Sequence, residues 1–246
     1  MYLAHTAHWQ FMGLMFGTLA WILIMATAGL NDWRMWNVAN VSVIDSGVAW
    51  VGIWRSCFYS HLLPSMENCY TMSISDPYVP TEISVAQVLM MLAVTSGLAA
   101  NITAIVAMRM VYFTMHYRRN IRLVFVLAGA LYLITGTLPL VPLVWTLSAV
   151  LNNSTIDFPP ESHFPSAPVR QHAGMAIAVG ISASILMILS GLVFLCYRYA
   201  WRDLSSAAPW QHRVDRTEAG LPQKPGLSYG KNHGIDNPVF RSEQIS

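Results

Sequence analysis

Charged residues are scarce in this chain. Only 11% of its 246 residues are Asp, Glu, Lys or Arg, whereas 54% are hydrophobic. Soluble globular proteins carry about 25% charged residues, so this composition is typical of a protein that lies in a lipid bilayer. Cysteine is scarcer still: the three residues leave room for one intramolecular disulfide and one unpaired thiol.

The common sequence motifs of enzymes are missing as well. The chain has no glycine-rich phosphate-binding loop, no His-Glu-x-x-His zinc motif and no Gly-x-Ser-x-Gly nucleophile elbow. Its long uncharged runs hold no paired carboxylates or histidines, which argues against a proton relay or a transporter. We therefore predict no enzymatic activity, no catalytic residue, no cofactor and no metal site.

Four long runs without charge are separated by polar segments. They cover residues 9–31, 83–108, 123–150 and 173–197. At ~1.5 Å per residue each run is long enough to cross a hydrocarbon core of ~30 Å, so we predict four transmembrane helices. We expect the first run to be retained, because it lacks the basic start and the small-residue cleavage site of a signal peptide. We expect the third run to project beyond the bilayer, with a bend near Pro139.

The orientation in the membrane follows from one basic segment. Residues 109–122 contain four arginines and no acidic residue. Because short cytoplasmic loops are enriched in Lys and Arg, we place this segment in the cytoplasm, together with residues 1–8 and 198–246. Topology explains so short a basic loop better than nucleic-acid binding does, and we predict no nucleic-acid partner. The tail is rich in Pro, Gly and charge, which predicts that it is largely disordered.

The first segment expected outside the cell, residues 32–82, is polar and rich in tryptophan. Five acidic residues and two arginines give it a net charge of −3. Alternating patterns at Val41–Val43 and Val48–Ile53 favour strands over helix. Asn40 begins an N-glycosylation sequon, and Asn152 and Asn153 each begin another in the second outer segment, residues 151–172.

Two of the three cysteines lie in this first outer segment. Cys57 and Cys69 are 12 positions apart between two apolar runs, which predicts a disulfide in an oxidising compartment; the alternative is a pair of buried free thiols. Closing a loop of this length stabilises a fold by roughly 3 kcal/mol. Cys196 lies at the inner end of the last run, where it is either a palmitoylation site or a plain helix-end cysteine.

Four tryptophans of the first outer segment admit two interpretations. They are either interfacial belt residues at the outer leaflet or core anchors of a small sheet. For Trp33 and Trp54, which bracket the segment before the cysteines, the core interpretation is favoured, whereas Trp36 and Trp50 stay open. Arg34 is either an exposed charge or a structural partner of an acidic residue.

Together these residues resemble the signature of the claudin family, Trp…Gly-Leu-Trp…Cys…Cys. The matching residues are Trp33, Arg34, Gly52, Ile53, Trp54, Cys57 and Cys69, with Ile53 in place of leucine. The resemblance extends from about Trp9 to Arg202 and includes the long first and short second outer loops. It implies an α-helical membrane protein with a left-handed four-helix bundle and a small extracellular antiparallel β-sheet.

The resemblance also implies a function. Claudins bind themselves and other claudins, side by side in one membrane (in cis) and across cells (in trans). They form tight-junction strands at the plasma membrane that seal the paracellular route or open it to selected ions. Related tetraspan families instead serve as auxiliary subunits of channels or receptors, and this is the alternative function. Partners implied here are other claudin chains and membrane lipid.

The sequence departs from the family pattern at three places. The interval between Cys57 and Cys69 holds 11 residues, somewhat more than is usual in the family. The position after Cys69, often a selectivity determinant in pore-forming members, is the uncharged Tyr70. The chain ends Gln244-Ile245-Ser246, and an apolar PDZ pocket would bind the final serine poorly, so recruitment by PDZ scaffolds is not expected.

Overall fold

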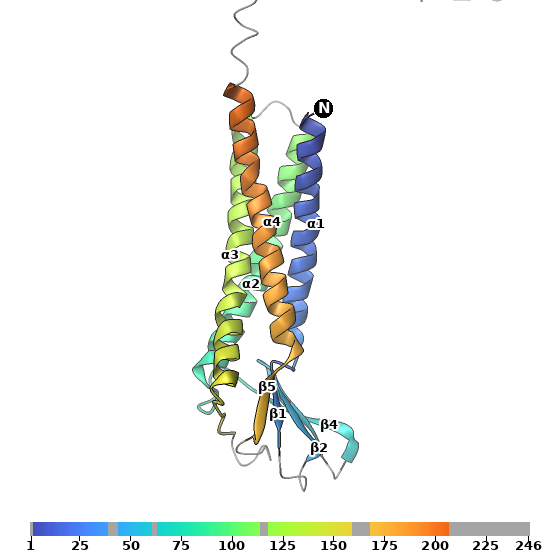
Figure 1. The fold of residues 1–246 in the computed structure, drawn as a ribbon, viewed down its shortest axis with the longest axis vertical. Helices are drawn as coiled ribbons and strands as arrows, with labels where there is room; N and C mark the ends of the chain where they lie inside the picture. The colour runs from blue at the N-terminus through green and yellow to red at the C-terminus, as the bar shows by residue number, and fades with distance from the viewer. Residues whose placement is uncertain (1, 39–43, 61–62, 114–117, 159–167, 207–246) are drawn as a thin grey trace, which may run out of the picture. The chain divides into compact units, whose positions relative to one another are not determined.

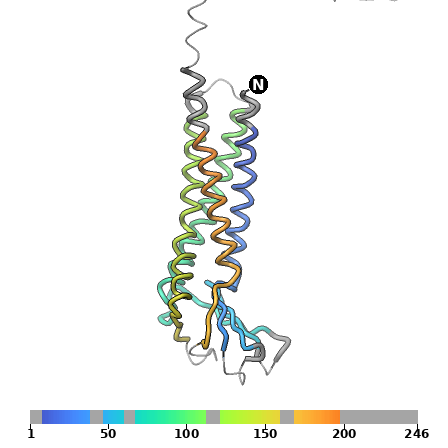
Figure 2. Tube along the Cα trace, in the orientation of Figure 1, coloured from blue at the N-terminus to red at the C-terminus, as the bar shows by residue number. Residues whose placement is uncertain are grey.

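The structure is a computed structural model that describes residues 2–38, 44–60, 63–113, 118–158 and 168–206 (Figures 1 and 2). Side chains are described over somewhat shorter ranges within these. The chain divides into two units, Met1–Asp203 and Leu204–Ser246. Among the described residues, the strands and helices belong to the first unit, except for the last residues of the fourth helix.

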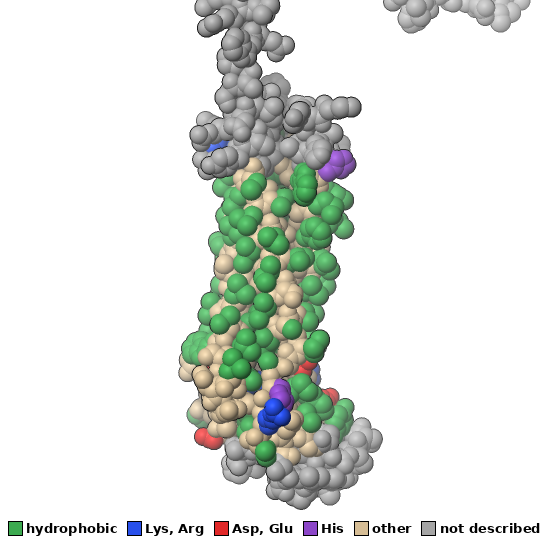
Figure 3. All heavy atoms as spheres, in the orientation of Figure 1, with side chains coloured by type: hydrophobic (Ala, Val, Ile, Leu, Met, Phe, Trp, Pro, Cys, Tyr) green, Lys and Arg blue, Asp and Glu red, His purple; other side chains and the backbone are tan. Residues whose placement is uncertain are grey.

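Four long helices lie side by side in the first unit (Figures 1 and 2). Their bounds are α1 Tyr2–Gly29, α2 Thr81–Phe113, α3 Arg118–Leu151 and α4 Met175–Ser206. Each contains a segment that is long and apolar enough to cross a membrane. Hydrophobic side chains cover the visible outer surface of the helices, as expected for a surface that contacts lipid rather than water (Figure 3).

The helices are longer than a bilayer requires. α2 and α3 contain 33 and 34 residues. At ~1.5 Å per residue they exceed a core of ~30 Å by several turns. α3 remains helical through Pro139 and Pro142 and continues past the end of α1 toward the sheet (Figure 1).

A five-stranded antiparallel sheet lies at that end of the bundle. Its order is β4-β3-β2-β1-β5, so β4 and β5 form the two edges. The strands are β1 Arg34–Asn37, β2 Ile44–Val51, β3 Arg55–Ser60, β4 Leu63–Thr71 and β5 Arg170–Ala173. The predicted fold class, a four-helix membrane bundle with a small antiparallel sheet, is therefore confirmed. β5 comes from the segment between α3 and α4 and ties that segment to the first one.

The two faces of the sheet have different surroundings, because successive side chains of a strand point to opposite faces. The inner face carries Trp36, Ala49 and Phe58, all buried. It packs against the start of α2 and the residues that follow α3; the Trp36 ring, for example, lies edge-on to Phe158 with centroids 5.6 Å apart. Trp36 is thus a core anchor of the sheet and not an interfacial belt residue.

The other face, which we call the outer face, is formed by two rows of side chains that run across the strands. The register places His172, Met35, Trp50, Cys57 and Cys69 in the first row. The second row consists of two parts, Arg170, Asn37 and Val48 on β5, β1 and β2, and Tyr59 and Glu67 on β3 and β4, and the register between β2 and β3 shifts between Ile44 and Ala49. Trp50 and Tyr59 make an edge-on ring contact at 5.6 Å on this face. Trp50 is therefore half-buried on the outer face, which is not a core position.

Inside the bundle, small residues let the helices approach closely. A Cβ at Gly97 of α2 would collide with the Trp21 ring of α1, and the Trp21 Nε1 donates to the Val94 carbonyl at 2.9 Å. One helix turn away, Asn101 Oδ1 accepts hydrogen bonds from the hydroxyls of Thr18 and Tyr132 at 3.0 and 2.9 Å. These contacts join α1, α2 and α3, as polar and small residues commonly do in membranes.

Candidate functional site

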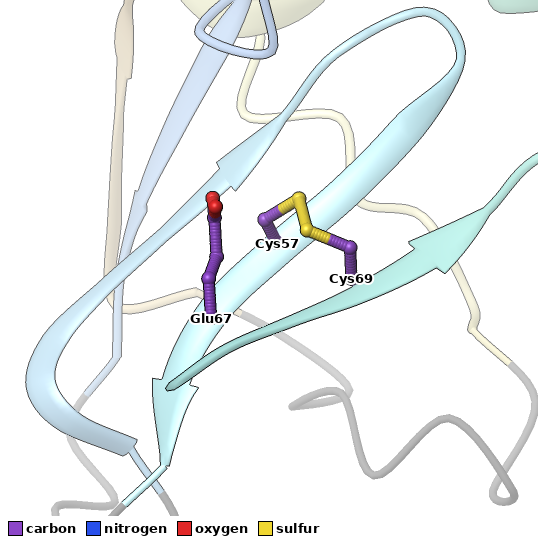
Figure 4. Close-up of side chains that lie close together, drawn as sticks. All are labelled: Cys57, Glu67 and Cys69. Atoms are coloured by element: carbon purple, nitrogen blue, oxygen red, sulfur yellow. A yellow bond between two sulfur atoms is a disulfide. The ribbon is translucent and has the colours of Figure 1, made fainter. Parts of the chain in front are cut away.

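The sheet carries the disulfide that the cysteine spacing predicted. Cys57 on β3 lies directly opposite Cys69 on β4, and the structure joins their sulfur atoms at 2.10 Å (Figure 4). Cys57 is fully buried, whereas Cys69 is exposed on the edge strand. The bridge thus fixes the edge strand β4 to the rest of the sheet.

Glu67 lies beside the bridge, two residues before Cys69 on the same face of β4 (Figure 4). One carboxylate oxygen and the two sulfur atoms lie within 4.8 Å of one another. Both sulfurs are bonded to each other, however, and a cysteine binds a metal as the thiolate. In the disulfide form this group of three residues offers one carboxylate and no thiolate, which does not fit a metal centre.

Two tryptophans join the sheet to the end of α1. The Trp33 Nε1 donates to the Thr27 carbonyl at 3.0 Å, and the Trp54 Nε1 donates to the Ala28 carbonyl at 2.9 Å. The last carbonyls of a helix have no partner within the helix, so these indoles satisfy groups that would otherwise stay unpaired. Trp33 is buried and Trp54 half-buried, which agrees with the interpretation of both as anchors of the sheet.

The residues between β2 and β3 pack tightly against the bundle. A Cβ at Gly52 would lie 2.8 Å from the Asn31 Cα, so only glycine fits between this turn and the end of α1. The next residue, Ile53, is buried, and its carbonyl accepts a hydrogen bond from the Gln87 amide of α2 at 2.6 Å. The same amide also donates to the Met72 carbonyl at 3.1 Å, just after β4.

Arg34 forms a buried ion pair with Glu82 in the first turn of α2. The Nη2 and Oε1 atoms are 2.8 Å apart, and the two side chains are 1% and 12% exposed. Burial lowers the pKa of Arg34, and the hydrogen bond and charge of Glu82 oppose that shift. The Nε and Nη1 atoms have no hydrogen-bond partner among the described residues. Of the two interpretations of Arg34, the structure shows the structural partner.

The start of α4 is fixed to the start of β1. The Asp32 carboxylate accepts a hydrogen bond from the Met175 amide at 3.2 Å, and the Trp33 carbonyl accepts one from the Gly174 amide at 3.0 Å. The first amides of a helix lack partners within it and favour a negative charge nearby. Gly174 packs so closely on the Asp32 carbonyl that no side chain fits there.

Sequence reasoning missed three of these polar residues. Asp32, Glu82 and Gln87 were not singled out, because each acts on a group far away along the chain. A local signal existed only for Glu82: an acidic residue in the first turn of a helix is common. That signal explains its position but does not identify Arg34 as its partner.

The outer face combines an apolar centre with charged ends. Its middle strands present four half-buried residues, Met35, Val48, Trp50 and Tyr59. Arg170 and His172 at its β5 end are exposed, and so is Glu67 at its β4 end. In Figure 3 basic and histidine side chains lie together at the sheet end of the molecule, below the hydrophobic helices. Arg55 is exposed on the same face, closer to the bundle.

The remaining predicted sites lie outside the sheet and stay predictions. Asn152 and Asn153 directly follow α3 and are exposed, and Cys196 is exposed near the described end of the α4 apolar segment. Asn40 and the ending Gln244–Ser246 lie outside the described residues.

Known sequences resemble this chain over most of its length. The family model described as PMP-22/EMP/MP20/Claudin tight junction matches residues 18–196. The chain belongs to the claudin family. Claudin-2 of Bos taurus is 24% identical over 188 residues, which cover 76% of this chain and 77% of the relative. Claudin-5 of Homo sapiens is 24% identical over 189 residues, with coverage of 76% and 81%.

A third relative is similar over a longer stretch. Claudin-17 of Sus scrofa is 25% identical over 220 residues, which cover 87% of this claudin and 94% of the relative. Together with the four apolar helices, the family makes this chain a multi-pass membrane protein. The matched range, residues 18–196, contains the five described strands, the disulfide and the tryptophan anchors.

Proposed function

We propose that this claudin is a structural protein of tight junctions at the plasma membrane. It associates with copies of itself and with other claudins, in cis and in trans, and the resulting strands form a paracellular barrier. The family supports this proposal, and so does the display of a rigid sheet at one end of the bundle. Four residues or pairs hold that sheet in place: the disulfide, the two tryptophan anchors and the buried ion pair.

The composition of the outer face favours a barrier over an ion-selective path. A surface that conducts ions needs charged or polar groups along the path, whereas an apolar constriction excludes ions. The centre of the outer face is occupied by Val48, Trp50 and Tyr59, and its acidic residue Glu67 lies at one edge. This apolar centre is the observation that carries the proposal.

The test is to express the chain in epithelial cells that lack other claudins. We expect enrichment at cell–cell contacts, membrane strands in freeze-fracture replicas, and a raised transepithelial resistance without a change in ion preference. A diffuse distribution with unchanged resistance would contradict the proposal and would favour the auxiliary-subunit alternative.

A matched pair of variants examines the role of the apolar centre. Trp50→Phe keeps an aromatic surface, and we expect it to keep the resistance of the wild type. Trp50→Glu puts a negative charge at the same place, and we expect a lower resistance with a dilution potential that favours cations. Equal resistance of both variants at equal surface expression would show that the outer face does not form the barrier.

A further inference from the structure

Two exposed arginines lie at the end of the bundle opposite to the sheet. Arg109 is four residues before the end of α2 at Phe113, and Arg122 is four residues after the start of α3 at Arg118. α2 and α3 run antiparallel and pack against each other, so the two arginines lie at about the same level (Figure 1). Both side chains are exposed, and within the described residues neither forms a salt bridge.

Acidic residues are absent from this part of the sequence. No Asp or Glu occurs between Glu82 and Asp157. Arg118 and Arg119 begin α3 and add two positive charges, and the first turn of that helix contains no acidic residue. In Figure 3 the visible acidic side chains lie at the sheet end of the molecule. The four positive charges of residues 109–122 are therefore not neutralised by an acidic residue of this stretch.

Exposed apolar side chains continue from each arginine toward the middle of the bundle. Ile105 lies one turn before Arg109 on the same side of α2 and is 54% exposed. Leu123 directly follows Arg122 and is 65% exposed, and Leu127 lies one turn further along α3 and is 53% exposed. Such residues contact the acyl chains of lipids, whereas an arginine near the end of a membrane helix extends to the headgroups. The two helices thus present guanidinium groups at the border of a surface that fits acyl chains.

The chemistry of the guanidinium group favours phosphate as its ligand. Its planar fork of N–H donors binds the oxygen atoms of a phosphate in pairs. Several guanidinium groups at one level repel each other, and an anion between them removes that repulsion. A headgroup with a single net charge compensates one of the four arginines, whereas a headgroup with several phosphates compensates more than one. Basic clusters on the cytoplasmic side of transmembrane helices are typical sites for such lipids.

We propose that the ends of α2 and α3 bind a phosphorylated inositol lipid of the cytoplasmic leaflet, with Arg109 and Arg122 holding its phosphates. Its acyl chains lie against the exposed surface that contains Ile105 and Leu123. This lipid site goes beyond the junction function and does not depend on strand formation. It requires this end of the bundle to face the cytoplasm, and glycosylation at the opposite end tests that orientation separately.

The binding experiment uses the purified full-length chain in detergent micelles. Phosphatidylinositol bisphosphate, phosphatidylserine and phosphatidylcholine are each titrated into the micelles, and bound lipid is measured by native mass spectrometry. We expect the bisphosphate to bind at least about tenfold more tightly than phosphatidylserine, because each further basic residue near the headgroup adds to binding. Equal affinities for these two anionic lipids would overturn the proposal, since they would indicate a general attraction to negative charge.

A double variant removes the two guanidinium groups that carry the site. One basic residue near an anionic headgroup contributes about a fivefold change in affinity, so we expect Arg109→Gln with Arg122→Gln to weaken binding of the bisphosphate roughly thirtyfold. The matched control is Arg55→Gln with Arg170→Gln, which removes two exposed charges at the sheet end and should bind like the wild type. Equal affinities of the two double variants would overturn the site.

Thermal unfolding gives a second, independent measurement. A ligand that binds the folded state raises the unfolding temperature. We expect the bisphosphate lipid to raise the unfolding temperature of the wild type and of the control variant, and to leave that of the Arg109→Gln, Arg122→Gln variant unchanged. A rise of the same size in all three proteins would contradict the assignment of the phosphates to these two arginines.

A competition experiment separates a lipid from a soluble ligand. Inositol trisphosphate carries phosphates on the same ring but has no acyl chains, so it cannot contact Ile105 and Leu123. We therefore expect it to displace the lipid only at a concentration at least about tenfold above that of the lipid, because the burial of apolar surface is lost. Displacement at equal concentrations would identify a soluble inositol phosphate as the ligand and would overturn the lipid site.

Discussion

At the scale of single residues, the guanidinium group of Arg34 is nearly sealed from water and has one carboxylate as its counter-charge. A buried charge tolerates the loss of its partner poorly, because the desolvation cost remains while the attraction disappears. The pair also connects β1 to the first turn of α2. It therefore stabilises the attachment of the sheet to the bundle as well as the side chains themselves.

We expect Glu82→Gln to destabilise the protein by roughly 3 kcal/mol, since it leaves the buried Arg34 without a counter-charge. The measurement is thermal unfolding of the purified chain in detergent. Asp157→Asn is the control; this exposed residue forms no recorded ion pair among the described residues, and its effect should stay within about 0.5 kcal/mol. Equal unfolding temperatures for the two variants would contradict the structural role of the pair.

The disulfide leads to a second prediction at this scale. We expect Cys57→Ala or Cys69→Ala to be retained before the cell surface, because the loss of a loop closure worth roughly 3 kcal/mol frees the edge strand β4. Cell-surface biotinylation measures delivery, and Cys196→Ala, which removes the unpaired thiol, is the control. Normal delivery of both bridge variants would argue against a structural role of the bridge.

At the scale of elements, the helices are held together by close backbone approach as much as by large side chains. Gly97 of α2 and Gly17 of α1 each face an aromatic ring of a neighbouring helix, Trp21 and Tyr132 respectively. Interiors this tightly packed accommodate added atoms only by displacing their neighbours. The glycines are therefore contact positions rather than flexible joints.

We predict that Gly97→Ala lowers the free energy of unfolding by roughly 1–3 kcal/mol, since the added methyl group forces Trp21 to move. Gly29→Ala is a matched control, because a Cβ at that position meets no other atom within 4 Å. Unfolding of both variants in detergent gives the comparison. A Gly97→Ala protein as stable as the control would show that Trp21 can shift at little cost.

The elements differ in how far the sequence alone predicts them. The four helices were predicted because uncharged runs of this length are typical of membrane-spanning helices. The run at residues 123–150, which forms most of α3, was the longest of the predicted spans. Alternation indicated part of β2. β5 carries no such pattern: its four residues read Arg-Gln-His-Ala, and only pairing with β1 makes them a strand. The partners of Arg34, Trp33 and Trp54 also depend on contacts between elements, which spacing along one segment does not reveal.

At the scale of the whole molecule, Asn101 gives a test of the topology. It begins a sequon in α2, but it is buried and its side-chain oxygen is shared by Thr18 and Tyr132. Asn152 and Asn153 are exposed beyond the end of α3. The structure therefore offers the latter two, and not Asn101, to a glycosylating enzyme.

We expect glycan at Asn40 or at Asn152 and Asn153, and none at Asn101. A glycosidase shift on gels measures this, and substitution of the three loop asparagines by glutamine should abolish it. A shift that survives the triple substitution would contradict the membrane topology.

The pairing of β5 with β1 has a consequence for biosynthesis. Arg170 of β5 pairs with Asn37 of β1 in the folded sheet. β5 therefore leaves the ribosome about 130 residues after β1, the strand with which it pairs. At ~5–20 residues per second that delay is on the order of ten seconds. Throughout this interval the nascent chain carries an open β1 edge in the compartment where its cysteines oxidise. Chaperones that protect unpaired strands would be needed at this stage, and a ribosome that stalls before residue 170 would leave the sheet open to pairing with another chain.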